Sequence, residues 1–121
     1  MKKFILLIED NDPIRENTIE FLELADYEVV ATNRGKNGLE MISVREPDLI
    51  LCDIAMPEMD GYEFLKTVRE VYGLTSIPFI FFTAFSEKND IQKGLQLGAT
   101  SYIIKPFEPD DLISLINKYL S

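Results

Sequence analysis

Histidine is missing from the 121 residues, and there is one cysteine, Cys52. Without histidine the chain has no Ser-His-Asp or Cys-His catalytic unit, no zinc site with histidine ligands and no phosphohistidine. A single cysteine forms no internal disulfide, which agrees with a reducing compartment. The apolar runs are too short to span a bilayer, and no charged-then-apolar leader precedes a cleavage site. We therefore expect a cytoplasmic protein that does not bind membranes.

Basic residues are also few: 12 Lys and Arg stand against 21 Asp and Glu, for a formal net charge of −9. Phosphate contacts need basic patches, so this balance argues against nucleic-acid binding by this chain. It is compatible with divalent cations and with basic partner surfaces. The length and the 46% hydrophobic content suit one domain over residues 1–121. Met1 leads us to expect a natural N-terminus.

Short apolar runs alternate with segments of helical periodicity. Such runs, bounded by turn residues, are typical of buried strands in a parallel sheet. The five predicted strands are Lys3–Ile8, Tyr27–Thr32, Leu49–Cys52, Pro78–Phe82 and Thr100–Ile104. This alternation predicts an α/β protein: a flavodoxin-like (βα)5 three-layer sandwich whose five-stranded parallel sheet has the order 2-1-3-4-5.

Local signals predict where the helices between these strands begin and end. Asp12 is the expected N-cap of the first helix, and Asp60 that of the third. The second helix should run from Gly35 to about Arg45. Ser86 is the expected cap of the fourth helix and Gly98 its C-terminal stop. The side chains expected to face the core are Ile14, Thr18, Phe21, Leu22, Ala25, Leu39, Ile42, Leu65, Val68, Tyr72, Ile91, Leu95, Leu112, Leu115, Ile116 and Tyr119.

Polar residues follow four of the predicted strands. They are Glu9 and Asp10 after the first, Asp53 after the third, Thr83 after the fourth and Lys105 after the fifth. Because parallel strands end at one edge of the sheet, these side chains should converge. Carboxylates in one pocket repel each other, and Mg²⁺ (or Mn²⁺) relieves the repulsion. We expect Asp53 to attack a phosphorus atom while Lys105 and Thr83 hold the phosphoryl oxygens.

The whole chain resembles the receiver domain of two-component response regulators, the family that includes the bacterial chemotaxis regulator. The motifs that carry the resemblance are Ile8-Glu9-Asp10, Asp53-Ile54-Ala55-Met56-Pro57-Glu58-Met59-Asp60-Gly61, Thr83-Ala84 and Lys105-Pro106-Phe107. The resemblance implies that Asp53 accepts a phosphoryl group from a sensor histidine kinase or a phosphotransfer protein. It also implies that Glu9, Asp10, Asp53 and the main-chain carbonyl of Ala55 bind the metal.

The resemblance further implies a switch. Thr83, with Ala84 beside it, would turn its hydroxyl toward the phosphoryl group, Lys105 would pair with that group, and the bond before Pro106 would be cis. Tyr102 matches the switch aromatic; the less favoured alternative is a half-buried strand residue without a switching role. The fourth helix, fifth strand and fifth helix would then present a changed surface to a downstream effector domain or protein. The same surface could also join two copies of the chain into a homodimer through the fourth and fifth helices.

Two positions bear on the lifetime of the phosphoryl group. Ala55 lies two residues after the acceptor, and Phe85 lies two residues after Thr83. Many relatives carry polar or charged residues there, whereas both positions are apolar in this chain. Phe85 either covers the site and slows hydrolysis, or packs on the fourth helix or on a partner.

Two other functions compete with the phosphorylation switch. A haloacid-dehalogenase-type phosphatase also uses a nucleophilic Asp after a parallel strand, but it needs a second acid where this chain has Ala55. A flavin carrier needs a phosphate-binding loop after the first strand, and the acids Glu9, Asp10 and Asp12 would repel a phosphate in the absence of a metal ion. Within the receiver interpretation, the chain is either a stand-alone regulator or a receiver cut from a longer protein.

Overall fold

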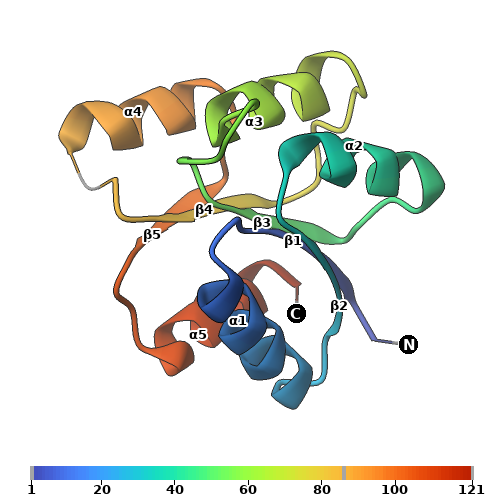
Figure 1. The fold of residues 1–121 in the computed structure, drawn as a ribbon, viewed down its shortest axis with the longest axis vertical. Coiled ribbons are helices and arrows are strands. Elements are labelled where there is room, and N and C mark those ends of the chain that lie inside the picture. The colour runs from blue at the N-terminus through green and yellow to red at the C-terminus, as the bar shows by residue number, and fades with distance from the viewer. Residues whose placement is uncertain (1, 86, 121) are drawn as a thin grey trace.

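The computed structural model describes residues 2–85 and 87–120, and five strands alternate with five helices along the chain (Figure 1). The elements are β1 (Phe4–Ile8), α1 (Asp12–Leu24), β2 (Glu28–Thr32), α2 (Gly35–Val44), β3 (Leu49–Cys52), α3 (Gly61–Glu70), β4 (Phe79–Thr83), α4 (Lys88–Gln96), β5 (Ser101–Ile104) and α5 (Pro109–Leu120). All strand pairs are parallel, and the sheet order is β2-β1-β3-β4-β5. The predicted fold class and strand order are therefore confirmed.

The sheet is the middle of three layers. In Figure 1, α1 and α5 cover one face, and α2, α3 and α4 cover the other. Because successive strand residues point to opposite faces, Leu6 and Ile8 of β1 pack under α2 and α3, whereas Ile5 and Leu7 pack against α1 and α5. β1, β3 and β4 are buried at every position, which explains their unbroken apolar runs.

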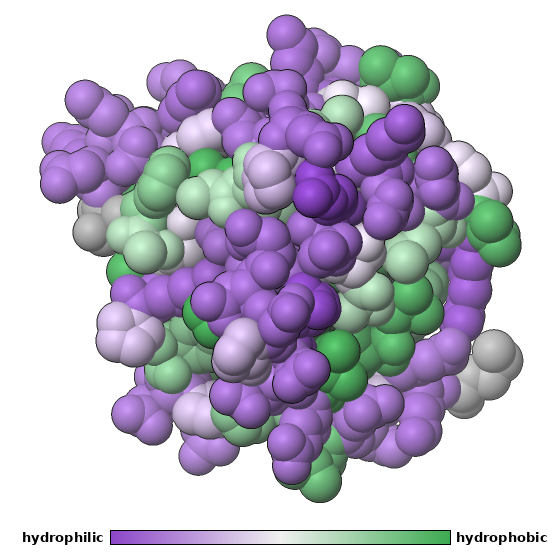
Figure 2. All heavy atoms as spheres, viewed as in Figure 1, coloured by the Kyte–Doolittle hydropathy of each residue, from purple (hydrophilic) through white to green (hydrophobic). Residues whose placement is uncertain are grey.

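β2 and β5 are the edge strands, and most of their side chains are only half-buried. On the face seen in Figure 2, hydrophilic residues dominate and hydrophobic ones reach the surface in small areas between the elements. Within residues 2–85 and 87–120, no helix has the length and the apolar character needed to cross a membrane.

The N-cap of α1 differs from the prediction. Asn11, and not Asp12, is the cap, because Asn11 Oδ1 accepts a hydrogen bond from Ile14 N at 3.0 Å. Asp12 is the first helical residue, where its negative charge interacts favourably with the positive end of the helix dipole. Its carboxylate pairs with Arg15 at 2.6 Å. The cap predicted for α3 is confirmed, since the Asp60 carboxylate accepts a hydrogen bond from the main chain three residues on.

Two residues predicted to face the core do not. Tyr72 lies beyond the end of α3 and is 37% exposed, and Leu95 of α4 is 46% exposed. Gly94 is instead the buried residue of α4, because the helix main chain lies close to the ring of Phe81. The end of α4 is as predicted: Gly98 has a φ of 109°, a left-handed conformation that favours glycine. Ser86, the predicted cap of α4, lies outside the described residues.

Candidate functional site

Asp53 is the first residue after β3 and is only 7% exposed. Its main-chain N–H donates to Ile8 O at 3.0 Å, which continues the pairing between β1 and β3. Its Oδ1 accepts a hydrogen bond from Ile54 N at 2.7 Å. The fold therefore holds a carboxylate in one orientation at the carboxyl edge of the sheet, with little water around it.

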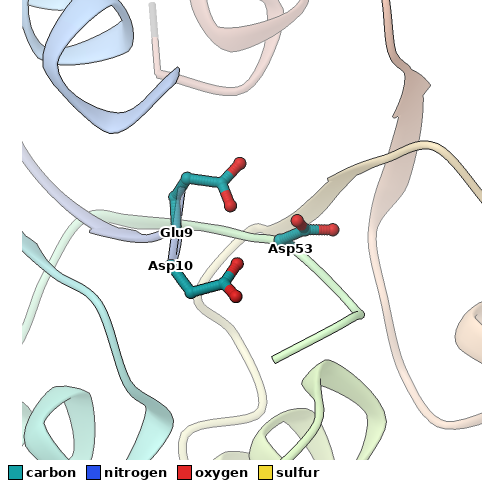
Figure 3. Close-up of side chains that lie close together, drawn as sticks. All are labelled: Glu9, Asp10 and Asp53. Carbon is teal, nitrogen blue, oxygen red and sulfur yellow. The ribbon is translucent and has the colours of Figure 1, made fainter. Parts of the chain in front are cut away.

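Glu9 and Asp10 follow β1 and lie beside Asp53, because Ile8 is in register with Cys52. Figure 3 shows the two side chains leaving the end of β1 on the side where Asp53 lies. Each of the three carboxylates offers an oxygen within 4.8 Å of the others. Burial raises the pKa of the Glu9 carboxyl to about 7, and the charge of Asp53 adds to the rise. The cluster therefore favours a cation between its members.

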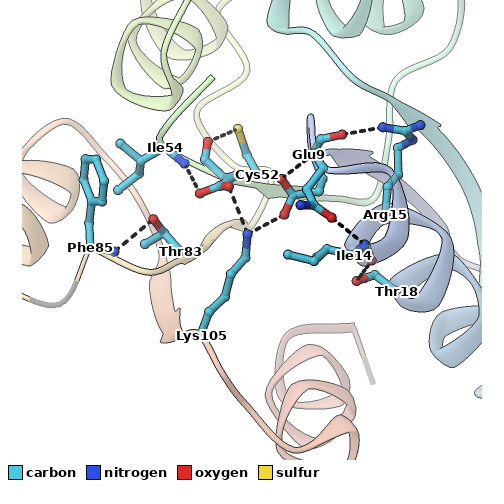
Figure 4. A network of polar contacts seen from close by, with 11 residues as sticks. Glu9, Ile14, Arg15, Thr18, Cys52, Ile54, Thr83, Phe85 and Lys105 are labelled. Atoms are coloured by element: carbon cyan, nitrogen blue, oxygen red, sulfur yellow. Dashed lines mark hydrogen bonds and ion pairs between the residues drawn. The ribbon is translucent and has the colours of Figure 1, made fainter. Parts of the chain in front are cut away.

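Lys105 supplies one cation, and Figure 4 shows its side chain reaching toward Glu9. Its Nζ donates a hydrogen bond to Asp53 Oδ2 at 2.9 Å and another to Glu9 Oε1. Burial lowers the pKa of Lys105, but these two hydrogen bonds and the negative charges of Asp53 and Glu9 together outweigh it and raise the pKa above its usual value. The Lys105–Pro106 peptide bond is cis, the isomer that the family resemblance implies.

The donor set of this cluster fits a divalent metal. Asp10 is exposed, so it presents a carboxylate to solvent beside the two buried ones. Three carboxylate oxygens, close together and open to water on one side, are the hard ligands that Mg²⁺ and Mn²⁺ prefer. Ala55 is exposed in the loop between β3 and α3, two residues beyond Asp53.

Thr83 ends β4 and is completely buried. Its Oγ1 accepts a hydrogen bond from Phe85 N at 3.2 Å, so the hydroxyl is engaged with the segment that follows β4 (Figure 4). Ala84 and Phe85 are exposed, the latter residue to 38%. The sequence predicted the place of Thr83 at the sheet edge, but not this bond.

Tyr102 pairs with Phe81 across β4 and β5, and the two rings pack edge to face at 5.7 Å. The ring also lies beside Gly94 of α4, which leaves room for it. Its hydroxyl is buried and has no hydrogen-bond partner among the described residues. Burial raises the pKa of Tyr102. The neighbouring Tyr62 hydroxyl donates to Asp90 O at 3.1 Å.

A groove beside the site was not predicted from the sequence. It has a volume of about 540 Å³ and runs between α1 and the loop that joins β5 to α5. The residues that line it are Ile14, Asn17, Thr18, Phe21, Ala84, Lys105, Pro106 and Phe107. The groove therefore connects Lys105, at the acidic cluster, with apolar side chains of α1.

Two supporting contacts were also missed by sequence reasoning. Ile54 acts through its main-chain N–H, which no side-chain pattern reveals. Arg15 donates from Nη1 to Glu9 O at 2.9 Å and so fixes the end of β1. The position of Arg15, one turn into the helix after β1, was the signal in the sequence that could have predicted the second contact.

Comparison with known proteins gives consistent matches over nearly the whole chain. A family described as "Response regulator receiver domain" matches residues 5–117. The transcriptional regulatory protein CrdR of Helicobacter pylori is 36% identical over 121 residues; the match covers 100% of this chain and 56% of CrdR. The chain therefore spans only about half the length of that relative. The polar-differentiation response regulator DivK of Brucella ovis is 35% identical, and the match covers 99% of this chain and 98% of DivK.

Solved structures agree with the sequence relatives. Vibrio cholerae chemotaxis protein CheY4 superposes with a TM-score of 0.93 at 29% identity, covering 98% of this chain and 99% of that one. A response regulator from Chloroflexus aurantiacus superposes with a TM-score of 0.93 at 31% identity, covering 99% of this chain and 98% of that one.

Proposed function

Because this chain belongs to the response regulator receiver domain family, we propose that it is a phosphorylation-dependent switch in which Asp53 accepts a phosphoryl group. The donor is a sensor histidine kinase or a phosphotransfer protein of a two-component system. The observation that carries the proposal is the position of the Asp53 carboxylate, which accepts a hydrogen bond from Lys105 Nζ and lies within 4.8 Å of carboxylate oxygens of Glu9 and Asp10.

The transfer is an in-line displacement at phosphorus. An oxygen of Asp53 forms the new bond to phosphorus while the bond from phosphorus to the donor's histidine nitrogen breaks, and the histidine retains the electron pair. Both Asp53 oxygens hold a hydrogen bond in the structure, one from Ile54 N and one from Lys105 Nζ. Lys105 therefore exchanges its bond with Asp53 for one with a phosphoryl oxygen, where its charge offsets the charge that develops.

Glu9, Asp10 and Asp53 would hold Mg²⁺ or Mn²⁺, together with the main-chain carbonyl of Ala55. When bound, the ion neutralises the charge on the phosphoryl oxygens. The exposed Asp10 opens the cluster to solvent, and the buried Glu9 is held in place by Lys105. Loss of one acid should therefore weaken metal binding without unfolding the sheet.

The signal leaves the site through Thr83. A phosphoryl group adds about −1.5 to −2 charge and three acceptor oxygens. The Thr83 side chain then turns so that its hydroxyl donates to one of them, which moves Oγ1 away from its present hydrogen bond with Phe85 N. Because Phe85 leads into α4, this loss repositions α4 relative to β5. β5 is a half-buried edge strand, so the α4–β5–α5 surface is open to a downstream effector or to a second copy of the chain.

The groove between α1 and the β5–α5 loop is where the donor would dock. It ends at Lys105, and its apolar residues Ile14, Phe21 and Phe107 suit a helical partner that buries one apolar face. A histidine carried on such a helix would reach Asp53 without moving the sheet.

The proposal is tested by incubating the chain with acetyl phosphate and Mg²⁺ and measuring its intact mass. The wild type should gain one phosphoryl group, and the gain should disappear without the metal. Asp53→Asn should gain nothing, whereas the matched control Asp110→Asn, an exposed position of α5, should behave as the wild type. Absence of any gain in the wild type would contradict the proposal.

A phosphatase that turns over is distinguished by repeating the incubation with an unactivated phosphate monoester in place of acetyl phosphate. The residue two positions after Asp53 is Ala55, which has no acid to protonate a leaving group. We therefore expect no sustained release of phosphate from unactivated phosphate monoesters.

A further inference from the structure

Gly61, the first residue of α3, lies against the main chain of the proposed acceptor. A Cβ added to Gly61 would lie 2.8 Å from Ile54 Cα and 2.9 Å from Phe81 Cε1, and it would come closer still to the Asp53 carbonyl oxygen. Two of these three atoms are main-chain atoms, which cannot rotate away as the tip of a side chain can. The Gly61 N–H also donates to Ile54 O at 2.8 Å. Gly61 therefore contacts the Asp53–Ile54 peptide directly.

This glycine is required for close approach and not for a special backbone conformation. Gly61 is helical, whereas Gly73 has a φ of 68° and nothing within 4 Å of an added Cβ. The absence of a side chain at the first position of α3 allows the helix to lie on the main chain of Asp53 and Ile54.

We propose that Gly61 is the positioning residue of the phosphoacceptor. The bare main chain at the start of α3 fixes the Asp53–Ile54 peptide. The Ile54 N–H of that peptide holds Asp53 Oδ1 at 2.7 Å, so a shift of the peptide moves the carboxylate. The bond from Gly61 to Ile54 also closes the loop that carries the Ala55 carbonyl. This inference rests on the proposed function, because it concerns the alignment of Asp53 for phosphoryl transfer.

The test compares Gly61→Ala with Gly73→Ala. Both should lower the melting temperature, the first by steric pressure and the second by placing alanine at a positive φ. At a temperature where both are folded, Gly61→Ala should accept phosphoryl from acetyl phosphate at least about tenfold more slowly at saturating Mg²⁺, because small misplacements are costly in such reactions. It should also bind Mg²⁺ more weakly by calorimetry. Gly73→Ala should keep the wild-type rate and Mg²⁺ affinity.

A second variant decides the matter if Gly61→Ala does not fold. Asp60→Ala removes the cap bond from Glu63 N to Asp60 Oδ1 and adds no atom against Asp53. It should loosen the same contact and slow phosphorylation severalfold while the protein remains folded. A wild-type phosphorylation rate and Mg²⁺ affinity in Gly61→Ala, or in Asp60→Ala if Gly61→Ala does not fold, would overturn the inference. An equal loss of rate and affinity in Gly73→Ala would also overturn it. If the wild type itself accepts no phosphoryl group, the proposed function fails, and the Mg²⁺ affinities still decide the role of Gly61.

Discussion

Lys105 and Asp53, 52 residues apart in the chain, are joined by a hydrogen bond of 2.9 Å at the carboxyl edge of the sheet. The same ammonium group also binds Glu9, so one cation serves two buried carboxylates. Without Lys105 these acids would face each other with little water and no neutralising charge. The bond therefore stabilises the resting site, and its exchange for a phosphoryl oxygen is the first step of the proposed switch.

Replacing Lys105 should destabilise the protein in the absence of metal. Lys105→Met leaves Glu9 and Asp53 without their cation, and we expect the free energy of unfolding to fall by about 3 kcal/mol. Urea denaturation without Mg²⁺ measures this change. Lys66→Met, at an exposed position of α3, is the control and should change stability little. Equal stabilities for the two variants would show that the bond from Lys105 contributes nothing.

Mg²⁺ should stabilise the folded chain through the acidic cluster. A ligand that binds only the folded state adds about 2.7 kcal/mol to the free energy of unfolding when its free concentration is about 100 times its dissociation constant. Asp10→Asn removes the exposed ligand and should reduce this gain, whereas Asp110→Asn should retain it. Thermal unfolding with and without Mg²⁺ makes the comparison. An undiminished gain in Asp10→Asn would place the metal elsewhere.

The buried hydroxyl of Tyr102 should be dispensable for stability. It has no hydrogen-bond partner among the described residues, so Tyr102→Phe should be neutral or stabilising by up to about 1 kcal/mol. Tyr62→Phe is the matched comparison: it loses the bond to Asp90 O and should cost about 1 kcal/mol. Chemical denaturation of both variants tests the difference, and a larger loss in Tyr102→Phe would show that its hydroxyl is paired.

Phe85 should slow loss of the phosphoryl group. Its ring is partly exposed, and its main-chain N–H donates a hydrogen bond to Thr83 Oγ1, so the residue adjoins the hydroxyl that would bind the phosphoryl group. Phe85→Glu should shorten the half-life of phosphorylated Asp53 severalfold by admitting water, and Phe85→Leu should change it much less. Decay is followed by intact mass after removal of acetyl phosphate. Identical half-lives in the wild type and Phe85→Glu would assign the ring to packing on α4 or on a partner.

The sheet could be predicted from the sequence because its central strands are buried on both faces and read as unbroken apolar runs. Convergence of Glu9, Asp53 and Lys105 followed from parallel topology alone. Helix details were less accessible. Asn11 and Asp12 are adjacent and equally good caps, so the pattern could not choose between them. Leu95 fits an apolar helical spacing, but the close approach of α4 to the sheet at Gly94 turns it outward.

Contacts made by the main chain could not be predicted at all. The bonds from Ile54 N to Asp53 and from Phe85 N to Thr83 depend on loop geometry, and any residue except proline could supply them. The close packing of α3 on the Asp53–Ile54 peptide likewise has only one sign in the sequence, the glycine at position 61. The chemistry was therefore readable from side chains, whereas its alignment required the structure.

The central claim is that phosphorylation of Asp53 changes a surface elsewhere on the molecule. Amide NMR spectra recorded with Mg²⁺, before and after addition of acetyl phosphate, test this most directly. The wild type should show shifts at Thr83 and across α4, β5 and the start of α5, and Asp53→Asn should show none of them. Shifts confined to residues beside Asp53, or identical shifts in Asp53→Asn, would contradict the claim.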